Sequence, residues 1–376
     1  MKIRLFTRLY LYLVLGALLF GSSAMAASPS PALLEAKSKA EAKGYIFFTS
    51  HEEIVARARK EGRLRVLSSL PTEAHEAMTR AFKKKYPFID VYFEELGSVE
   101  GAQRFLLEVK AGLAKGWDVN RIYTEFYDQY LAHQKKFDIL GMAEHKVLGM
   151  FPQMVDPNNR HVVAPSSNVH VVAYNRRLIS EDKVPSHWEE FLKPEFKGRK
   201  FAAEIRPVGV AALVPAWGIE KTVDFSRKIA AQQPIWGRGH TSLIASVLAG
   251  ELSMFMGTNF SAVKRAQVKD PEQKLGYKFL EPVSGRLHLT EGVLGTAEHP
   301  HAGLLWLEFE ASAEGQDILD KHWPFGASVL FPASAQGSQI KGKKLSLIDW
   351  SHYTRLDEYT AKVVEAYGFP KVEKGR

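Results

Sequence analysis

Short apolar runs alternate with amphipathic helical segments through most of this chain, and this alternation restricts the folds open to it. Residues 64–67 (LRVL) and 89–95 (IDVYFEE) are typical of strands. Between them, apolar side chains recur at helical spacing, at Ala74, Ala77, Met78, Ala81 and Phe82. A second helical pattern follows Ser98, and residues 117–123 (WDVNRIY) are the next expected strand. Such alternation predicts βαβ units and a mostly parallel sheet.

The same alternation resumes after residue 170. Strands are expected at residues 169–175, 200–205, 234–237 and 252–257, and helices follow the last two. Polar clusters stand directly after these runs, for example at residues 257–259. In open α/β sheets ligands bind at the carboxyl ends of the strands. We therefore predict two α/β lobes whose strand-end loops face each other across a cleft.

The first 26 residues have the anatomy of a secretory signal peptide. MKIRLFTR is basic, LYLYLVLGALLF is apolar, and Ala24 and Ala26 provide a small-x-small cleavage signal. The apolar run is shorter than the ~20 residues of a membrane-spanning helix, and an uncleaved anchor is the alternative. We expect residues 27–45, which are small and charged, to form a flexible arm. The mature protein is then expected in the periplasm.

Composition favours a protein that relies on its hydrophobic core. The chain contains no cysteine, so no disulfide can hold an exported form together. The length after the leader is enough for two domains. The formal net charge is +8, and three of the basic residues lie in the leader. The others are dispersed, which argues against a nucleic-acid partner and fits a modest preference for anions.

The sequence contains no complete catalytic or cofactor-binding motif. Residues 337–344 (GSQIKGKK) have the glycine spacing of a phosphate loop, but Lys344 stands where Ser or Thr is required. Residues 237–242 (GRGHTS) lack the third glycine of a dinucleotide-binding loop. HEEIV and HEAMT lack the second histidine of a zinc helix, and no G-x-S-x-G motif exists. We expect no enzyme activity, no cofactor and no resident metal.

Several stretches, in order between about residues 53 and 318, resemble the extracellular solute-binding proteins of ABC importers. RARKEGRLRVLSSLPTEAHEAMTRAFKKKYPFIDVYF resembles their opening strand, ligand loop, helix and second strand. SSNVHVVAYNRRLI resembles the crossover strand into their second lobe. VPSHWEEFLKPEFKGR, VLAGELSMFM and HPHAGLLWLEFEASAEGQ resemble three further segments of the family. The ordered set makes the resemblance more specific than any one stretch.

The resemblance implies a two-lobed periplasmic binding protein fold of type II, with two hinge crossings. Residues 46–165 and 284–376 would form the first lobe, and residues 166–283 the second. It also implies closure on a solute and delivery to an inner-membrane ABC permease, and we expect a monomer. A sensory binding protein without a transporter and an exported enzyme on the same scaffold are the alternatives.

The resemblance leans toward the iron(III)-binding branch of the family. Members that bind ferric ion directly carry adjacent tyrosines on the helix after the strand that here reads LSMFMG. Asn259 and Phe260 stand at those positions, and neither supplies a phenolate. Tyr123, Tyr127 and Tyr130 offer phenols from another loop. The alternative function is therefore an iron(III)-binding component with a non-tyrosine or anion-assisted site.

The candidate ligand-binding side chains are neutral or positive and lie in the expected strand-end loops and at the hinge. Helix N-termini and guanidinium groups favour anions. We therefore predict a small anionic solute: a carboxylate, a phosphate ester or a phosphonate. Structural alternatives are a surface ion pair for Arg206 and a capping role for His240. The candidate residues are Ser68, Ser69, Thr72, Tyr123, Ser167, Asn168, Arg206, Arg238, His240, Thr241, Thr258 and Asn259.

Overall fold

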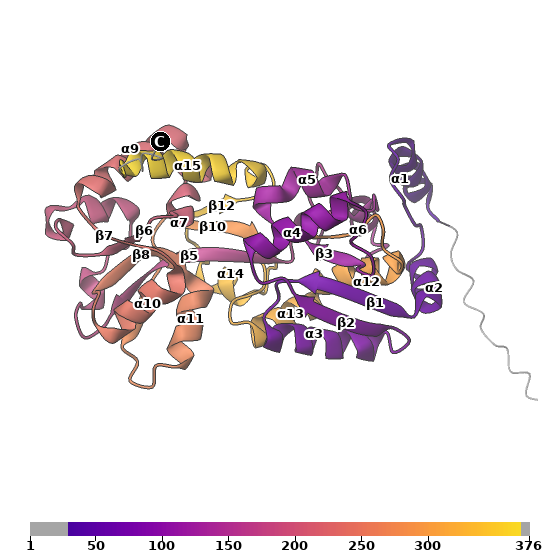
Figure 1. Ribbon diagram of the computed structural model, residues 1–376, viewed down its shortest axis with the longest axis horizontal. Helices are drawn as coiled ribbons and strands as arrows, with labels where there is room; N and C mark the ends of the chain where they lie inside the picture. Colours follow the sequence, from indigo (N-terminus) through magenta and orange to yellow (C-terminus); the bar gives the residue numbers. More distant parts are fainter. Residues whose placement is uncertain (1–28, 370–376) are drawn as a thin grey trace, which may run out of the picture.

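Five strands form the central sheet of the first lobe in the computed structural model, which describes residues 29–369 (Figure 1). Their order is β2-β1-β3-β11-β4. The first three strands along the chain pair in parallel, as predicted, whereas β11 is antiparallel to β3 and β4. The sheet is therefore mixed. The strands are β1 (Arg63–Ser68), β2 (Asp90–Glu95), β3 (Val119–Arg121), β4 (Val162–Val163) and β11 (Glu291–Val293).

Helices pack on both faces of this sheet because most of them carry an apolar face. One face of the sheet contributes to a core with Phe82 and Trp306, and the other to a core with Phe105 and Tyr130. All four aromatic side chains are buried, which contributes ~2–3 kcal/mol each to the hydrophobic stabilisation. The helices are α2 (His51–Glu61), α3 (Thr72–Lys85), α4 (Val99–Lys110), α5 (Tyr127–Leu131), α6 (Ile139–Glu144), α12 (Pro300–Glu310) and α13 (Ala313–His322).

The second lobe is built on a larger mixed sheet. Its strand order is β12-β10-β5-β8-β6-β7, and β9 also pairs with β5. β6 is parallel to β7 and β8, while β5 is antiparallel to β8, β9 and β10. The strands are β5 (Ser166–Asn175), β6 (Ala202–Glu204), β7 (Ile235–Gly237), β8 (Met254–Asn259), β9 (Leu275–Lys278), β10 (Val283–His288) and β12 (Leu345–Ile348).

Two groups of helices cover this second sheet. Side chains of α7, α8, α9 and α15 belong to one core, and those of α10 and α11 to another. In Figure 1 the first group lies above the sheet and the second below it. The helices are α7 (Val208–Ala211), α8 (Val214–Trp217), α9 (Ile219–Ala231), α10 (His240–Ala249), α11 (Phe260–Val268) and α15 (Leu356–Tyr367).

The chain passes between the lobes three times, one more than the two crossings expected. β5 and β10 are the expected hinge strands, and they pair with each other. The third passage is the segment 323–344, which contains α14 (Ala335–Gln339) and leads from α13 to β12. Its start bonds to the hinge, because the Ser166 hydroxyl donates to the carbonyl of Gly326 at 2.6 Å.

The last part of the chain lies in the second lobe, which differs from the predicted assignment of residues 284–376 to the first. β12 pairs with β10 in the second sheet, and α15 packs against α9. Leu356, Tyr359 and Val363 of α15 are buried in the same core as Trp188 and Phe225. Their apolar spacing predicts a helix, but no local pattern states which lobe that helix covers.

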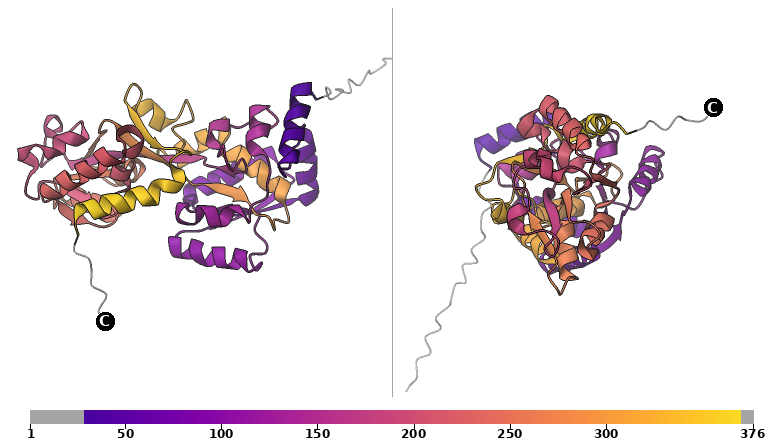
Figure 2. Two further views of the ribbon diagram at one scale, coloured as in Figure 1. Left: turned by 90° about the horizontal axis from the view of Figure 1, so that it is seen from above. Right: turned by 90° about the vertical axis from the view of Figure 1, so that its left-hand side faces the viewer.

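The N-terminal segment also differs from its prediction. Residues 31–42, expected in a flexible arm, form helix α1 (Pro31–Ala42), which begins after the capping hydroxyl of Ser30. Figures 1 and 2 show α1 at the end of the first lobe that is remote from the second. The predicted signal peptide lies outside the described residues. No helix within residues 29–369 has the length and hydropathy needed to cross a membrane.

Gly62, which ends α2, has a left-handed backbone with a φ of 66°. A Cβ there would meet no atom closer than the Phe88 carbonyl at 3.8 Å, so strain rather than collision opposes a side chain. We expect Gly62→Ala to lower the free energy of unfolding by about 1 kcal/mol in denaturant titrations. Gly97→Ala is the control, because Gly97 is exposed and has no positive φ. Equal effects of the two substitutions would contradict the prediction.

Candidate functional site

Polar side chains gather where strands of the two lobes end near the hinge. β1 ends at Ser68 and β3 at Arg121 in the first lobe, while β8 ends at Asn259 in the second. The hinge strand β5 passes beside the end of β8, since His170 pairs with Asn259. The ends of parallel strands are the usual ligand-binding edge of an α/β sheet. This junction is therefore the candidate site.

Ser69 and Tyr123, two predicted site residues from different loops, lie side by side in the first lobe. Their hydroxyl oxygens are 3.3 Å apart, and both donate to the carbonyl of Leu96, at 2.7 and 2.9 Å. The guanidinium of Arg121 lies over the Tyr123 ring, 5.0 Å from its centroid. The loop after β1 and the end of β3 thus form one polar corner, which includes an arginine that the prediction did not name.

Ser68 and Ser167 are fully buried, and both hydroxyls have partners inside the protein. The Ser68 hydroxyl donates to the carboxylate of Glu291. The Ser167 oxygen accepts a hydrogen bond of 2.8 Å from the backbone N–H of Val329, in the third passage between the lobes. These bonds fix the strand end and the hinge. A direct contact of either residue with a ligand stays a prediction.

His240 and Thr258 bring together two predicted loops of the second lobe. His240 is the first residue of α10, and its Nδ1 lies 3.0 Å from the hydroxyl oxygen of Thr258 at the end of β8. Burial and the nearby positive charge of Arg286 lower the pKa of His240 to about 4. Its imidazole is therefore neutral at neutral pH. Asn259, the next residue of β8, is half-buried.

Arg206 and Arg238 are exposed residues of two adjacent loops in the second lobe. Both loops are anchored by the buried carboxylate of Glu204, which accepts from the backbone N–H of Arg206 at 3.4 Å and of Gly239 at 2.9 Å. Neither guanidinium forms an ion pair within the described part of the chain. Both arginines are thus available at the surface, and their role in ligand binding stays a prediction.

Arg121 and Arg286, which the sequence reasoning missed, carry unpaired nitrogens in the protein interior. Arg121 is 5% exposed, yet its Nε and Nη1 have no hydrogen-bond partner among residues 29–369. Its Nη2 lies 3.5 Å from Nδ1 of His288. Nε of Arg286 is likewise buried and unpartnered. A buried cation without an acceptor is costly, so these groups are suited to receive an anion.

The two hinge strands extend this polar region. Arg286 and His288 stand two residues apart on β10, on one face, and Asn168 of β5 pairs directly with Arg286. Oδ1 of Asn168 and Nε2 of His170 have no partner in the described structure. Burial and the charges of Arg121 and Arg286 lower the pKa of His288, and burial lowers that of His170 to about 3. The positive charge therefore resides on the arginines.

A groove of about 620 Å³ runs between the lobes beside this cluster. Two predicted residues line it: Thr72 begins α3 in the first lobe, and Thr241 lies in α10 of the second. Trp323 also lines it, and its ring lies 6.1 Å from that of His288. The groove thus adjoins the unpaired guanidinium groups.

The phenols and acidic groups offer little to a bare ferric ion. Phe260, where the resemblance noted in the sequence would place a phenol, is buried among other aromatic rings. Tyr127 donates to Asp156, Tyr130 donates to the carbonyl of Ala102, and burial raises the pKa of both phenols. Within residues 29–369 no group of three or more His, Cys, Asp or Glu side chains is arranged to hold a metal.

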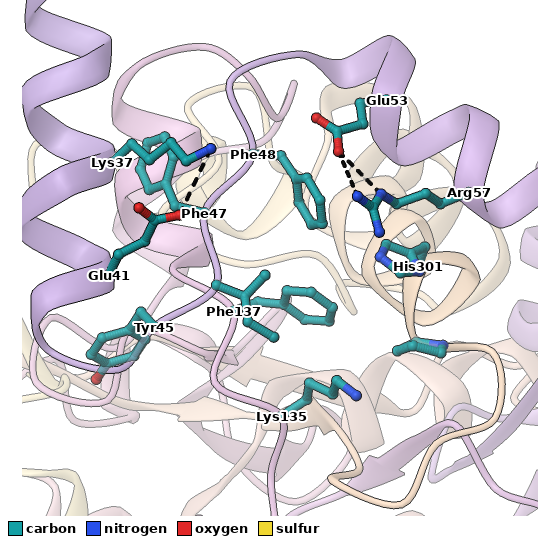
Figure 3. Close-up of a pocket in the computed structure, with 12 residues that line it drawn as sticks. Lys37, Glu41, Tyr45, Phe47, Phe48, Glu53, Arg57, Lys135, Phe137 and His301 are labelled. Carbon is teal, nitrogen blue, oxygen red and sulfur yellow. Dashed lines mark hydrogen bonds and ion pairs between the residues drawn. The ribbon is translucent and has the colours of Figure 1, made fainter.

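A separate pocket of about 460 Å³ lies between α1, α2 and the start of α12 (Figure 3). Its charges are largely paired, because Lys37 lies 3.7 Å from Glu41 and Arg57 lies 2.8 Å from Glu53. All the residues that line it belong to the first lobe, so closure of the lobes cannot enclose a ligand there. The remaining lining includes Phe47, Phe48, Phe137 and His301.

Comparisons with solved structures agree with the two-lobed fold. Iron-bound HitA from Pseudomonas aeruginosa shares 18% identity over 81% of this chain and 99% of its own, with a TM-score of 0.59. The Trichodesmium protein IdiA, or FutA, in complex with iron and citrate shares 18% over 82% and 100%, with a TM-score of 0.61. The Atu4243 GABA receptor shares 13% over 83% and 100%, with a TM-score of 0.60.

The sequence comparison identifies the family. No curated protein sequence matches the chain. The model of the bacterial extracellular solute-binding proteins matches residues 126–354, more than half of the chain, and it spans both hinge strands and the whole second sheet. This match confirms the resemblance found in the sequence motifs. The chain belongs to the bacterial extracellular solute-binding protein family.

Proposed function

We propose that this protein captures a small organic anion between its two lobes and delivers it to the membrane permease of an ABC importer. The observation that carries the proposal is the buried guanidinium of Arg121, whose Nε and Nη1 have no acceptor within residues 29–369. A carboxylate or phosphonate would supply acceptors for charge-assisted hydrogen bonds along one edge of this guanidinium. Arg286 and the neutral His288 would complete a site that prefers anions.

Closure of the lobes around the hinge would trap the solute, and the closed form would be what the permease recognises. The family supports location outside the cytoplasmic membrane, and we assign the protein to the periplasm as a monomer. The family is one of solute-binding proteins, so we infer binding without turnover. Incubation with each bound solute, followed by mass spectrometry, tests this part: a chemically altered solute would contradict it.

The ligand class is tested by thermal denaturation with acetate, benzoate, phosphate, methylphosphonate and phenylphosphonate. A binder present at 100 times its Kd is expected to stabilise the protein by about 2.7 kcal/mol. Stabilisation should be confined to anions and should weaken as ionic strength rises. Failure of every organic anion to shift the melting temperature would overturn the proposal.

A second candidate is import of iron(III) together with a carrier anion, favoured by the iron-bound and iron–citrate complexes among the structural neighbours. The unpaired arginines would then bind the carrier, and the metal would depend on it. Thermal denaturation with ferric citrate, citrate alone and ferric nitrilotriacetate distinguishes the two candidate functions. Stabilisation by ferric citrate but not by citrate, with a visible charge-transfer band, would favour the second candidate. Equal stabilisation by citrate with and without iron would exclude it.

A further inference from the structure

The groove between the lobes has a mainly apolar lining. From the second lobe, α10 contributes Ile244 and Leu248, and α11 contributes Ala262 and Ala266. Trp323 closes it from the first lobe. Such a surface gains little from a small, fully hydrated anion, because burying apolar area is favourable only against another apolar surface. The apolar lining of the groove therefore bears on the uncharged part of the solute and not on its charged group.

Charge around the groove is mostly positive. Arg265 of α11 and Lys269, which directly follows this helix, line it, and neither forms an ion pair with another described residue. Glu73 is the one carboxylate among the side chains that line the groove within residues 29–369. An anion entering along this groove would therefore move through a favourable field toward the interior.

The groove connects to the unpaired guanidinium groups through two contacts. The ring of Trp323 lies 6.1 Å from the ring of His288, and Nδ1 of His288 lies 3.5 Å from Nη2 of Arg121. The indole Nε1 of Trp323 is itself buried and has no acceptor among the described residues. The polar cluster of Arg121 and His288 thus lies next to the Trp323 wall of an apolar groove, which is an arrangement that suits an amphiphilic ligand.

We propose that the solute is an amphiphilic anion, with a carboxylate or phosphonate head at Arg121 and Arg286 and an apolar body in the groove. This inference rests on the proposed function and narrows its substrate class. A groove of about 620 Å³ accommodates an apolar body on the order of ten non-hydrogen atoms. The body would pack on Leu248 and Ala266 of the second lobe and on Trp323 of the first, so the same contacts would hold the lobes closed.

The test is calorimetric titration of the full-length mature protein with acetate, butyrate, hexanoate and octanoate. Each added methylene buried in the groove is expected to tighten binding about fourfold, until the groove is filled. Equal affinities along the series, or exclusion of the longer acids while acetate binds, would overturn this inference and leave the proposed function intact. If none of the four acids binds, and neither methylphosphonate nor phenylphosphonate binds, the proposed function is overturned as well.

Substitutions in the wall of the groove test whether the dependence of affinity on chain length arises there. Ala266→Phe fills the groove from α11 and should reduce the ratio of octanoate to acetate affinity at least tenfold. Ala249→Phe is the matched control, because Ala249 is exposed at the end of α10 and does not line the groove. If Ala266→Phe fails to fold, Leu248→Gln tests the same wall by making it polar. An unchanged ratio in a folded variant of either kind would contradict the inference.

Discussion

Replacing Arg121 with methionine is expected to weaken anion binding about 100-fold and, at the same time, to stabilise the ligand-free protein. Charge-assisted hydrogen bonds contribute ~1.5–3 kcal/mol each, and the proposed ligand would accept two from this side chain. Without ligand, the same buried nitrogens lack an acceptor within residues 29–369, so methionine removes a desolvation cost of about 2 kcal/mol. Calorimetric titration and thermal denaturation of the ligand-free protein measure the two effects.

This prediction is specific because the substitution is expected to lower the affinity for the anion and to raise the stability of the ligand-free protein. Arg80→Met is the control, because Arg80 is exposed on α3 and pairs with Glu76 at 3.6 Å, so it should change neither quantity appreciably. If Arg121→Met loses both ligand binding and stability, Arg121 stabilises the folded protein, which would contradict the prediction. Retention of binding with a raised melting temperature would place the ligand elsewhere, and Arg286→Met would then show whether the second guanidinium carries it.

The order of the elements could be read from the sequence because it depends on local periodicity. The strand expected at residues 64–67 is β1, and the helical spacing from Ala74 to Phe82 is the buried face of α3. The strand expected at residues 117–123 is shorter, because β3 ends at Arg121. Sheet membership is not local: β11 is antiparallel to β3 although almost 170 residues separate them, and this pairing makes the sheet mixed.

The site was less accessible to sequence reasoning than the fold. Ser68 stands in the predicted loop, but its hydroxyl turns toward Glu291, a contact that no spacing in the sequence reveals. Arg121 lies inside the strand expected at residues 117–123, and a strand pattern does not tell which of its ends meets another lobe. One signal was available. Ser284, Arg286 and His288 alternate along an otherwise apolar hinge strand, and polar residues at this period share one face.

Glu291 and Glu310 form a buried carboxyl pair directly behind this site. Both are fully buried, and Glu291 accepts from the Ser68 hydroxyl. Its second oxygen and both oxygens of Glu310 have no hydrogen-bond partner within the described residues. Burial raises the pKa of both carboxyls, and the proximity of Glu291 raises that of Glu310 further, while Arg121 opposes the shift at Glu291. The pair therefore retains a proton at pH values where an exposed glutamate is ionised.

The sign of the resulting pH dependence follows from linkage. A carboxyl whose pKa is raised in the folded state binds more protons folded than unfolded, so its contribution to stability is complete below the unfolded pKa of ~4.3. That contribution is lost as the pH rises through the folded-state pKa. Glu310→Gln keeps the shape of the protonated acid and cannot ionise. We expect it to match the parent protein near pH 4.5 and to exceed its stability by about 2 kcal/mol at pH 8.

Denaturant titrations between pH 4.5 and pH 9 measure how the unfolding free energies of Glu310→Gln and the parent protein diverge. Glu358→Gln is the control, because the pKa of Glu358 is lowered rather than raised. Arg355 and Lys362 bind Glu358 at the surface and lower its pKa, so amidation there removes a favourable charge and should bring no gain at high pH. Parallel stability curves for Glu310→Gln and the parent would show that the pair is not protonated in the folded state. A diverging curve would show that Glu310, beside the carboxyl group that holds the Ser68 hydroxyl, is protonated in the folded state.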